Sequence, residues 1–216
     1  MNISEDFVFP IPDSFSDITA PPLLCAGAIG YRALRLTNLH DGQILGLFGF
    51  GASAHIVIQV VKYKFPNSKV FVFTRAGQTE HQSMALKLGA DWAGATGEEP
   101  PAKINSAIDF TPVWKPIVEA LKVLEKGGRI VINAIRKEDV DKHSLLELNY
   151  EKHLWLEKEI KSVANIVRAD VEEFLPLAAK IPIIPEVQEF EMEQANEALI
   201  LLKQGKIQGA GVLRIS

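Results

Sequence analysis

Two glycines separate two apolar segments in the stretch LFGFGASAHIVIQV, residues 47–60. The segment before them, Ile44–Phe48, has the composition of a buried strand, and the segment after them, Ala52–Tyr63, has the length and apolar content of a helix. A chain that passes directly from a strand into a helix needs backbone torsions that glycine adopts without steric penalty. Gly49 and Gly51 therefore predict a strand–turn–helix unit, which favours an α/β fold.

The same alternation of apolar runs and helical periods continues along the chain. Helical periods predict helices at Gln78–Leu88 and Pro116–Leu124, the second ended by the pair Gly127 and Gly128. With 216 residues, 47% of them apolar, the chain can fill a substantial core. Strand, helix and strand in this order predict a doubly wound parallel sheet. The further strands are expected at Val70–Thr74, Ser106–Phe110, Arg129–Asn133 and Ile160–Ala164.

The segments at either side of this core have their own patterns. Residues 21–36 read as a helix that a proline pair begins, because proline is tolerated in a first turn. The charged segment 136–159 is either a loop over the sheet or a surface that faces a partner. Residues 169–181 resemble an amphipathic helix, and residues 185–216 resemble a strand, a helix ended by Gly205, and a second strand.

Charge and cysteine content exclude several classes of partner. A formal net charge of −4, from 23 basic and 27 acidic residues, provides no field to attract nucleic acid or an anionic membrane. The N-terminus lacks the basic start and apolar run of a secretory signal, and no segment approaches 18 uninterrupted apolar residues. Cys25 is the only cysteine, which excludes an internal disulfide and any zinc site built from several thiolates of this chain. We expect a soluble protein in the reducing cytoplasm.

The glycine turn also fits a pattern that binds phosphate. Residues Gly49, Phe50, Gly51, Ala52, Ser53 and Ala54 match G-x-G-x-x-G/A, with Ala54 at the small-residue position where the helix packs on the strand. A side chain at the second glycine would block a ligand that approaches closely, and the following helix directs unpaired N–H groups at the ligand. The alternative interpretation is a tight turn that only packing requires.

The residues after the next strand bear on the identity of the ligand. An NAD-binding protein has a carboxylate there for the ribose hydroxyls, whereas this chain has Thr74 and Arg75. A guanidinium binds a 2′-phosphate through charge-assisted hydrogen bonds, so this pair favours NADP over NAD. Arg75 is otherwise an ordinary solvated loop residue. The missing acid also argues against a methyltransferase.

Other predicted cofactor contacts follow the two later strands of the sheet. In doubly wound sheets the ligand crevice lies outside the carboxyl ends of the strands. These positions are Phe110 and Thr111 after one strand, and Asn133, Ala134 and Ile135 after the next.

Six segments, in order and with matching spacing, carry a family resemblance: PPLLCAGAIGYRALRL, GLFGFGASAHIVIQV, VFVFTRAGQTEHQSMALKLGADWAG, LEKGGRIVINAI, IKSVANIVRADVEEFLPLAA and EMEQANEALILLKQGKIQGAGVLRI. Together they resemble the zinc-dependent alcohol dehydrogenases of the medium-chain dehydrogenase/reductase family. The resemblance implies a Rossmann NADP-binding domain at 21–184. It also implies short remnants of a second, GroES-like catalytic domain: residues 1–20, with a linker, and a strand–helix–strand at 185–216 that returns toward it.

The resemblance also implies a zinc site of which this chain holds one part. Cys25 matches the family's final catalytic zinc ligand, while the other ligands belong to the domain that has no counterpart here. Catalytic zinc needs three protein ligands, so we expect zinc not to bind stably. Ile29 and Gln208 stand where the family often has a threonine beside the nicotinamide and a basic residue near the diphosphate. No metal-ligand spacing relates the histidines to one another or to Cys25: His40, His55, His81, His143 and His153.

The sequence therefore predicts the cofactor-binding portion of an NADP-dependent alcohol dehydrogenase, with little activity alone. A non-catalytic NADP-binding module and a zinc-independent quinone or enoyl reductase are the alternatives, and Cys25 argues against the reductase. We expect a homodimer, because family members join the edge strands of their sheets, here near Ile160–Ala164. An apolar face exposed around four residues would also recruit a partner. These residues are Leu23, Leu24, Val212 and Leu213.

Overall fold

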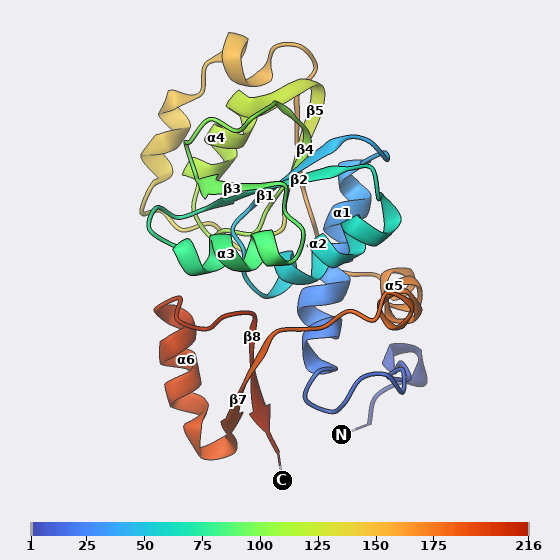
Figure 1. Ribbon diagram of the computed structural model, residues 1–216. Coiled ribbons are helices and arrows are strands. Elements are labelled where there is room, and N and C mark those ends of the chain that lie inside the picture. Colours follow the sequence, from blue (N-terminus) through green and yellow to red (C-terminus); the bar gives the residue numbers. More distant parts are fainter. Residues whose placement is uncertain (1, 216) are drawn as a thin grey trace.

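The computed structural model describes residues 2–215 and contains a six-stranded, wholly parallel sheet (Figure 1). The strand order is β3-β2-β1-β4-β5-β6, so the chain runs outward from β1 in one direction and then returns to build the other half. This is the doubly wound Rossmann topology that the sequence predicts. The strands are β1 Ile44–Phe48, β2 Lys69–Thr74, β3 Trp92–Ala95, β4 Ile104–Asp109, β5 Leu124–Ile132 and β6 Glu159–Ser162.

The central strands are apolar on both faces because helices cover both sides of the sheet. On one face, side chains such as Leu45, Val72 and Val131 pack in a core with several helices. On the other face, Phe48 and Phe73 stack with ring centroids 4.2 Å apart within a second core, which the helix between β4 and β5 covers. The helices are η2 Leu23–Gly27, α1 Ala28–Thr37, α2 Ala52–Lys64, α3 Thr79–Lys87, α4 Lys115–Val123 and α5 Arg168–Lys180.

The last thirty or so residues form a small unit below the sheet, drawn in red in Figure 1. It consists of β7 Val187–Glu191, η5 Met192–Gln194, α6 Ala195–Lys203 and β8 Ala210–Arg214, and its two strands are parallel. Gly205 has φ +67° directly after this helix, as expected of a helix end. The predicted strand, helix and strand are confirmed.

Several details differ from the sequence-based expectations. Helix α4 ends at Val123, and Gly127 and Gly128 lie inside β5, where the register with β4 shifts between Ile104 and Ser106. The two glycines therefore lie at a register shift within a strand and do not end a helix. Strand β3 was not predicted, because the sequence WAGA at 92–95 has little of the β-branched content that marks a strand.

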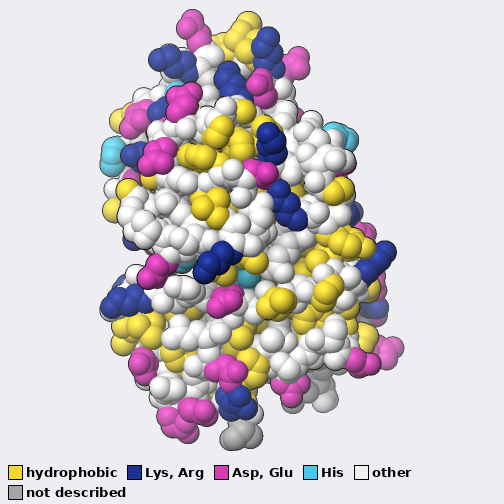
Figure 2. All heavy atoms as spheres, viewed as in Figure 1, with side chains coloured by type: hydrophobic (Ala, Val, Ile, Leu, Met, Phe, Trp, Pro, Cys, Tyr) yellow, Lys and Arg dark blue, Asp and Glu magenta, His cyan; other side chains and the backbone are white. Residues whose placement is uncertain are grey.

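The charged segment after β5 forms two short helices, η3 Lys142–Glu147 and η4 Tyr150–Leu154, which pack against α4. The expected apolar face is wrong in part, because Leu23 and Val212 are buried while Leu24 is exposed. On the face in Figure 2, acidic and basic side chains are interspersed rather than gathered by sign. Within residues 2–215, none of the helices has the length and apolar content needed to cross a membrane.

Candidate functional site

A cleft of about 960 Å³ opens at the carboxyl ends of β1, β4, β5 and β6. It includes the point between β1 and β4 where the strand order reverses, which is where open α/β sheets bind their ligands. Its volume lies within the range of small-molecule sites. The lining comes from η2 and α1, the glycine turn, and the loops after β4, β5 and β6: Leu24, Cys25, Ala26, Ile29, Gly49, Phe50, Gly51, Ala52, Ser53, Phe110, Pro112, Asn133, Ala134, Ile135, Arg136, Val163, Ala164, Asn165 and Ile166.

The glycine turn joins β1 to α2 at the floor of this cleft. Gly49 has φ +85°, a torsion that favours glycine, and a Cβ there would also lie in tight contact with Cγ2 of Thr111, at 3.0 Å. Gly51 differs, because its backbone is extended and no atom lies within 4 Å of the position that a Cβ would take. The space beside Gly51 is open toward the cleft, as a close ligand requires. Ala54 is fully buried where the helix meets the sheet.

The N-terminus of α2 faces the same open space. No side chain among the described residues caps this end of the 13-residue helix. The first N–H groups of a helix have no intrahelical partner and carry a partial positive charge, so they attract an anion. Ala52 and Ser53 line the cleft at this end, and the side chain of Phe50 is 4% exposed within the core. The turn therefore offers backbone N–H groups rather than side chains.

Thr74 and Arg75 lie at the carboxyl end of β2, beside the glycine turn but outside the lining of the cleft. Thr74 is 1% exposed, and its hydroxyl hydrogen-bonds with the carbonyl of Gly94 at 3.4 Å and accepts from Nε2 of Gln82 at 2.9 Å. Arg75 is exposed, and its guanidinium forms no ion pair with any residue in the described part of the chain. Its charge is available to a ligand, whereas the hydroxyl of Thr74 is already engaged.

The loops after β4 and β5 form the opposite wall. Phe110 and Asn133 line it, and Ile135 extends fully into solvent. Oδ1 of Asn133 is buried without a hydrogen-bond partner among the described residues. Thr111 lies behind this wall, because its hydroxyl donates to Asp109 at 2.7 Å.

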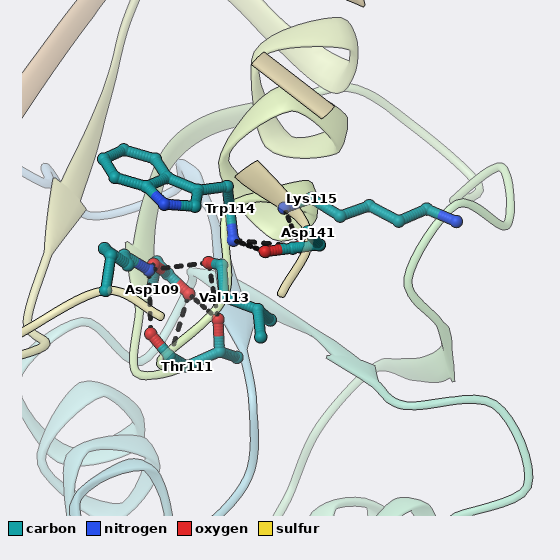
Figure 3. Close-up of polar contacts among 7 residues, drawn as sticks. Asp109, Thr111, Val113, Trp114, Lys115 and Asp141 are labelled. Atoms are coloured by element: carbon teal, nitrogen blue, oxygen red, sulfur yellow. Dashed lines mark hydrogen bonds and ion pairs between the residues drawn. The ribbon is translucent and has the colours of Figure 1, made fainter. Parts of the chain in front are cut away.

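Behind the wall lies a buried ion pair that the sequence did not reveal. Asp109 at the end of β4 is in contact with Lys137 in the loop after β5, and their side chains are 0% and 9% exposed. Burial raises the pKa of the Asp109 carboxyl, while Lys137 and Thr111 oppose that effect. Figure 3 shows Asp109 with Thr111 and Val113, and Asp141 against Trp114 and Lys115. An acid that ends a buried run must have a partner, but nothing local indicates which residue it is.

Cys25 is exposed in η2 and lines the cleft beside Leu24 and Ile29. Residues 2–215 contain no group of three or more His, Cys, Asp or Glu residues that could hold a metal ion. His55, near the glycine turn, is buried: its Nδ1 lies 3.2 Å from the carbonyl oxygen of Gly51, and its Nε2 accepts from the N–H of Glu186 at 3.0 Å. The donor set around Cys25 thus does not make a zinc site by itself.

Comparisons with known proteins agree with this arrangement. No protein-family model matches the chain. The probable alcohol dehydrogenase AdhA of Mycobacterium tuberculosis is 40% identical over 209 residues, which are 97% of this chain and 58% of that protein.

Two solved structures have a similar fold. The cinnamyl alcohol dehydrogenase SbCAD4 of Sorghum bicolor superposes with a TM-score of 0.80 at 21% identity, covering 98% of this chain and 59% of that one. The CAD protein of Helicobacter pylori, solved as a complex with NADP(H), superposes with a TM-score of 0.78 at 18% identity and the same coverage. The chain thus spans less than three fifths of the length of each of these relatives.

Proposed function

Because this chain is related to the alcohol dehydrogenases of the medium-chain dehydrogenase/reductase family, we propose that its cleft binds a nicotinamide dinucleotide and prefers NADP to NAD. The observation that carries the proposal is the open space beside Gly51, at the uncapped N-terminus of α2 and at the reversal of strand order. A diphosphate there would accept hydrogen bonds from backbone N–H groups and meet the positive end of the helix.

The rest of the dinucleotide then has a defined direction. In this fold the residue after β2 contacts the ribose of the adenosine, so the adenosine lies toward β2 and the nicotinamide toward β4, β5 and β6. Arg75, exposed and without an acidic partner among the described residues, would bind a 2′-phosphate through charge-assisted hydrogen bonds. Oδ1 of Asn133 would accept a hydrogen bond from the nicotinamide half.

For the whole protein we propose hydride transfer between the carbinol carbon of an alcohol and the nicotinamide ring. The residues of this chain would bind the cofactor and orient its nicotinamide face. The described residues do not supply the ligands of a zinc ion, so we derive no step through zinc, and Cys25 would be one ligand at most. We assign cofactor binding to residues 21–184, and contact with a catalytic domain to residues 1–20 and 185–216. Alone, the chain would be a poor catalyst.

The test is a fluorescence titration of the native chain with NADPH and with NADH. We expect NADPH to bind about 10- to 100-fold more tightly, because hydrogen bonds to charged groups contribute about 1.5–3 kcal/mol. Arg75→Glu should remove this preference by weakening NADPH alone. Lys69→Glu is the matched control, because it makes the same charge change at the exposed, opposite end of β2. Equal affinities for the two cofactors in the native chain would contradict the role of Arg75.

We also propose that the chain forms a homodimer through β6. This strand is the edge of the sheet and pairs only with β5 in the described structure, so its outer N–H and C=O groups are free to pair with a second strand. Ile160 on this strand is 44% exposed. Sedimentation equilibrium should give the mass of a dimer for the native chain and of a monomer for Ile160→Asp. A monomeric native chain would refute this proposal.

A further inference from the structure

We propose that Lys137 is a positioning residue that holds the nicotinamide-side wall of the cleft in its binding geometry, an inference that rests on the proposed function. The side chain of Lys137 is almost completely buried, and all three of its ammonium hydrogens have acceptors. Nζ contacts the carboxylate of Asp109 and donates to the carbonyl oxygens of Thr111 at 2.7 Å and Val113 at 2.9 Å. A loop after β5 is thereby bound to the loop after β4.

Asp109 completes this connection from the other side. Its Oδ1 accepts hydrogen bonds from the N–H of Thr111 at 3.0 Å and from its hydroxyl at 2.7 Å. Its backbone carbonyl accepts from the N–H of Asn133 at 2.8 Å, so Asp109 also holds the first residue after β5. Both charges of this network are paired, and a displacement of either loop would leave a charge unpaired in a medium of low dielectric constant, which opposes movement.

The connection continues along both loops beyond the ion pair. The N–H of Glu138 donates to the carbonyl of Pro112 at 2.7 Å. The carboxylate of Asp141 then accepts from the N–H groups of Trp114 and Lys115 at 2.7 to 3.0 Å, at the start of α4 (Figure 3). Two irregular segments of the chain are therefore fastened together over residues 109–115 and 133–141.

The two connected loops also provide the residues that line this wall of the cleft. Phe110 and Pro112 come from one loop, and residues 133–136 come from the other. Surface loops are usually the mobile parts of a fold, and a wall made of two unfastened loops would have to be ordered when a ligand binds. Lys137 does not line the cleft, so it acts through the residues that it holds. Lys137 itself contacts neither the glycine turn nor Arg75, which we propose to hold the diphosphate and the 2′-phosphate. Its one connection to the turn is indirect, through Thr111, whose methyl group lies beside Gly49.

The test compares two ligands that share the adenosine half. We expect Lys137→Met to weaken NADPH about tenfold and to change the affinity for adenosine 2′,5′-bisphosphate less than twofold, both measured by calorimetry. Arg32→Met is the matched control. It removes a hydrogen bond of 2.8 Å to the buried Asp170, between α1 and α5 and away from the wall. This control should lower the melting temperature and leave the ratio of the two affinities unchanged.

A purely structural role for Lys137 predicts a different result. Lys137→Met would then change both affinities in parallel, as Arg32→Met does, and that outcome would overturn the proposal. If Lys137→Met does not fold, Lys137→Arg keeps the charge but cannot reach all three acceptors from one nitrogen, and it should weaken NADPH about threefold with the bisphosphate unchanged. A native chain that binds neither ligand would refute the proposed function itself. If the native chain binds both ligands and the Lys137 variants leave the ratio of the two affinities unchanged, as the control does, only the role of Lys137 would be refuted.

Discussion

The two halves of the cleft are built by different means. In the half next to β1, the contact surface is backbone: a glycine turn and the first turn of α2. Arg75, after β2, lies outside the lining of the cleft. In the half formed by β4, β5 and β6, the contact surface is a pair of loops held from behind by Asp109 and Lys137. The first half depends on small residues that are adjacent along the chain. The second half depends on a contact between two residues, Asp109 and Lys137, that lie 28 positions apart in the sequence.

The difference is explained by the ligand groups that we propose for the two halves. A diphosphate is recognised by N–H groups that the end of any helix provides, so a local turn is enough. A nicotinamide ring must instead be held at a defined angle for hydride transfer, and the loops that hold it need support of their own. We expect substitutions in the first half to weaken ligand binding by blocking or removing a direct contact. Substitutions in the second half should weaken it by making the two loops more mobile.

The largest effect should come from a side chain at Gly51, in the half of the cleft that is built from backbone. Gly51→Val should fold normally, because the backbone there is extended and the added Cβ meets no protein atom within 4 Å. The added methyl groups would occupy the space of the diphosphate. We expect NADPH and adenosine 2′,5′-bisphosphate to weaken about 100-fold or more, near 2.7 kcal/mol, with an unchanged melting temperature. Gly51→Ala should have a smaller effect in the same direction, and tight binding by Gly51→Val would contradict our site.

A smaller effect concerns His55, which links the phosphate-facing helix to the C-terminal unit. Burial lowers the pKa of this imidazole, so it stays neutral and accepts a hydrogen bond from the N–H of Glu186. Below the ordinary histidine pKa of about 6.5, the unfolded chain binds a proton that the folded chain does not, and stability falls as the pH falls. The contribution has a slope of at most about 1.4 kcal/mol per pH unit and vanishes above that pH.

Urea unfolding between pH 5 and 8 measures this slope. His55→Asn should reduce it, and His40→Asn, at an exposed loop position, is the control. His153 adds to the slope with the same sign, because burial lowers its pKa too. An unchanged slope in His55→Asn would show that the histidine gives no pH dependence to the joint between α2 and the C-terminal unit.

The smallest effect on cofactor binding should come from Thr74. The sequence names Thr74 together with Arg75 as a cofactor contact, but the hydroxyl of Thr74 is buried and already hydrogen-bonded. We expect Thr74→Val to cost about 1 kcal/mol of stability, a shift of roughly 2–4 °C in melting temperature. The affinity for NADPH should change less than twofold in the same titration. A tenfold loss would restore Thr74 as a direct contact.

Much of the fold could be predicted because its signals are local. The bounds of β1 agree with the prediction, and those of β2 agree within one residue, since each is a short apolar run between turn residues. Strand β3 was not predicted, because its four residues form a strand through their pairing with β2 and not through a strand-forming composition of their own. The charged segment 136–159 could not be assigned, because its short helices are held by packing against α4.

The glycine turn and the helix that follows can be predicted from the sequence, because torsional freedom, small size and a helix end are properties of adjacent residues. The sequence also shows the absence of an acid after β2 and the presence of Arg75. The three-dimensional packing was needed to show which charge neutralises Asp109, that Leu23 and Val212 are buried, and that two loops form one wall. A buried charge requires some partner, but the identity of that partner depends on which distant residues the parallel sheet brings to the same edge.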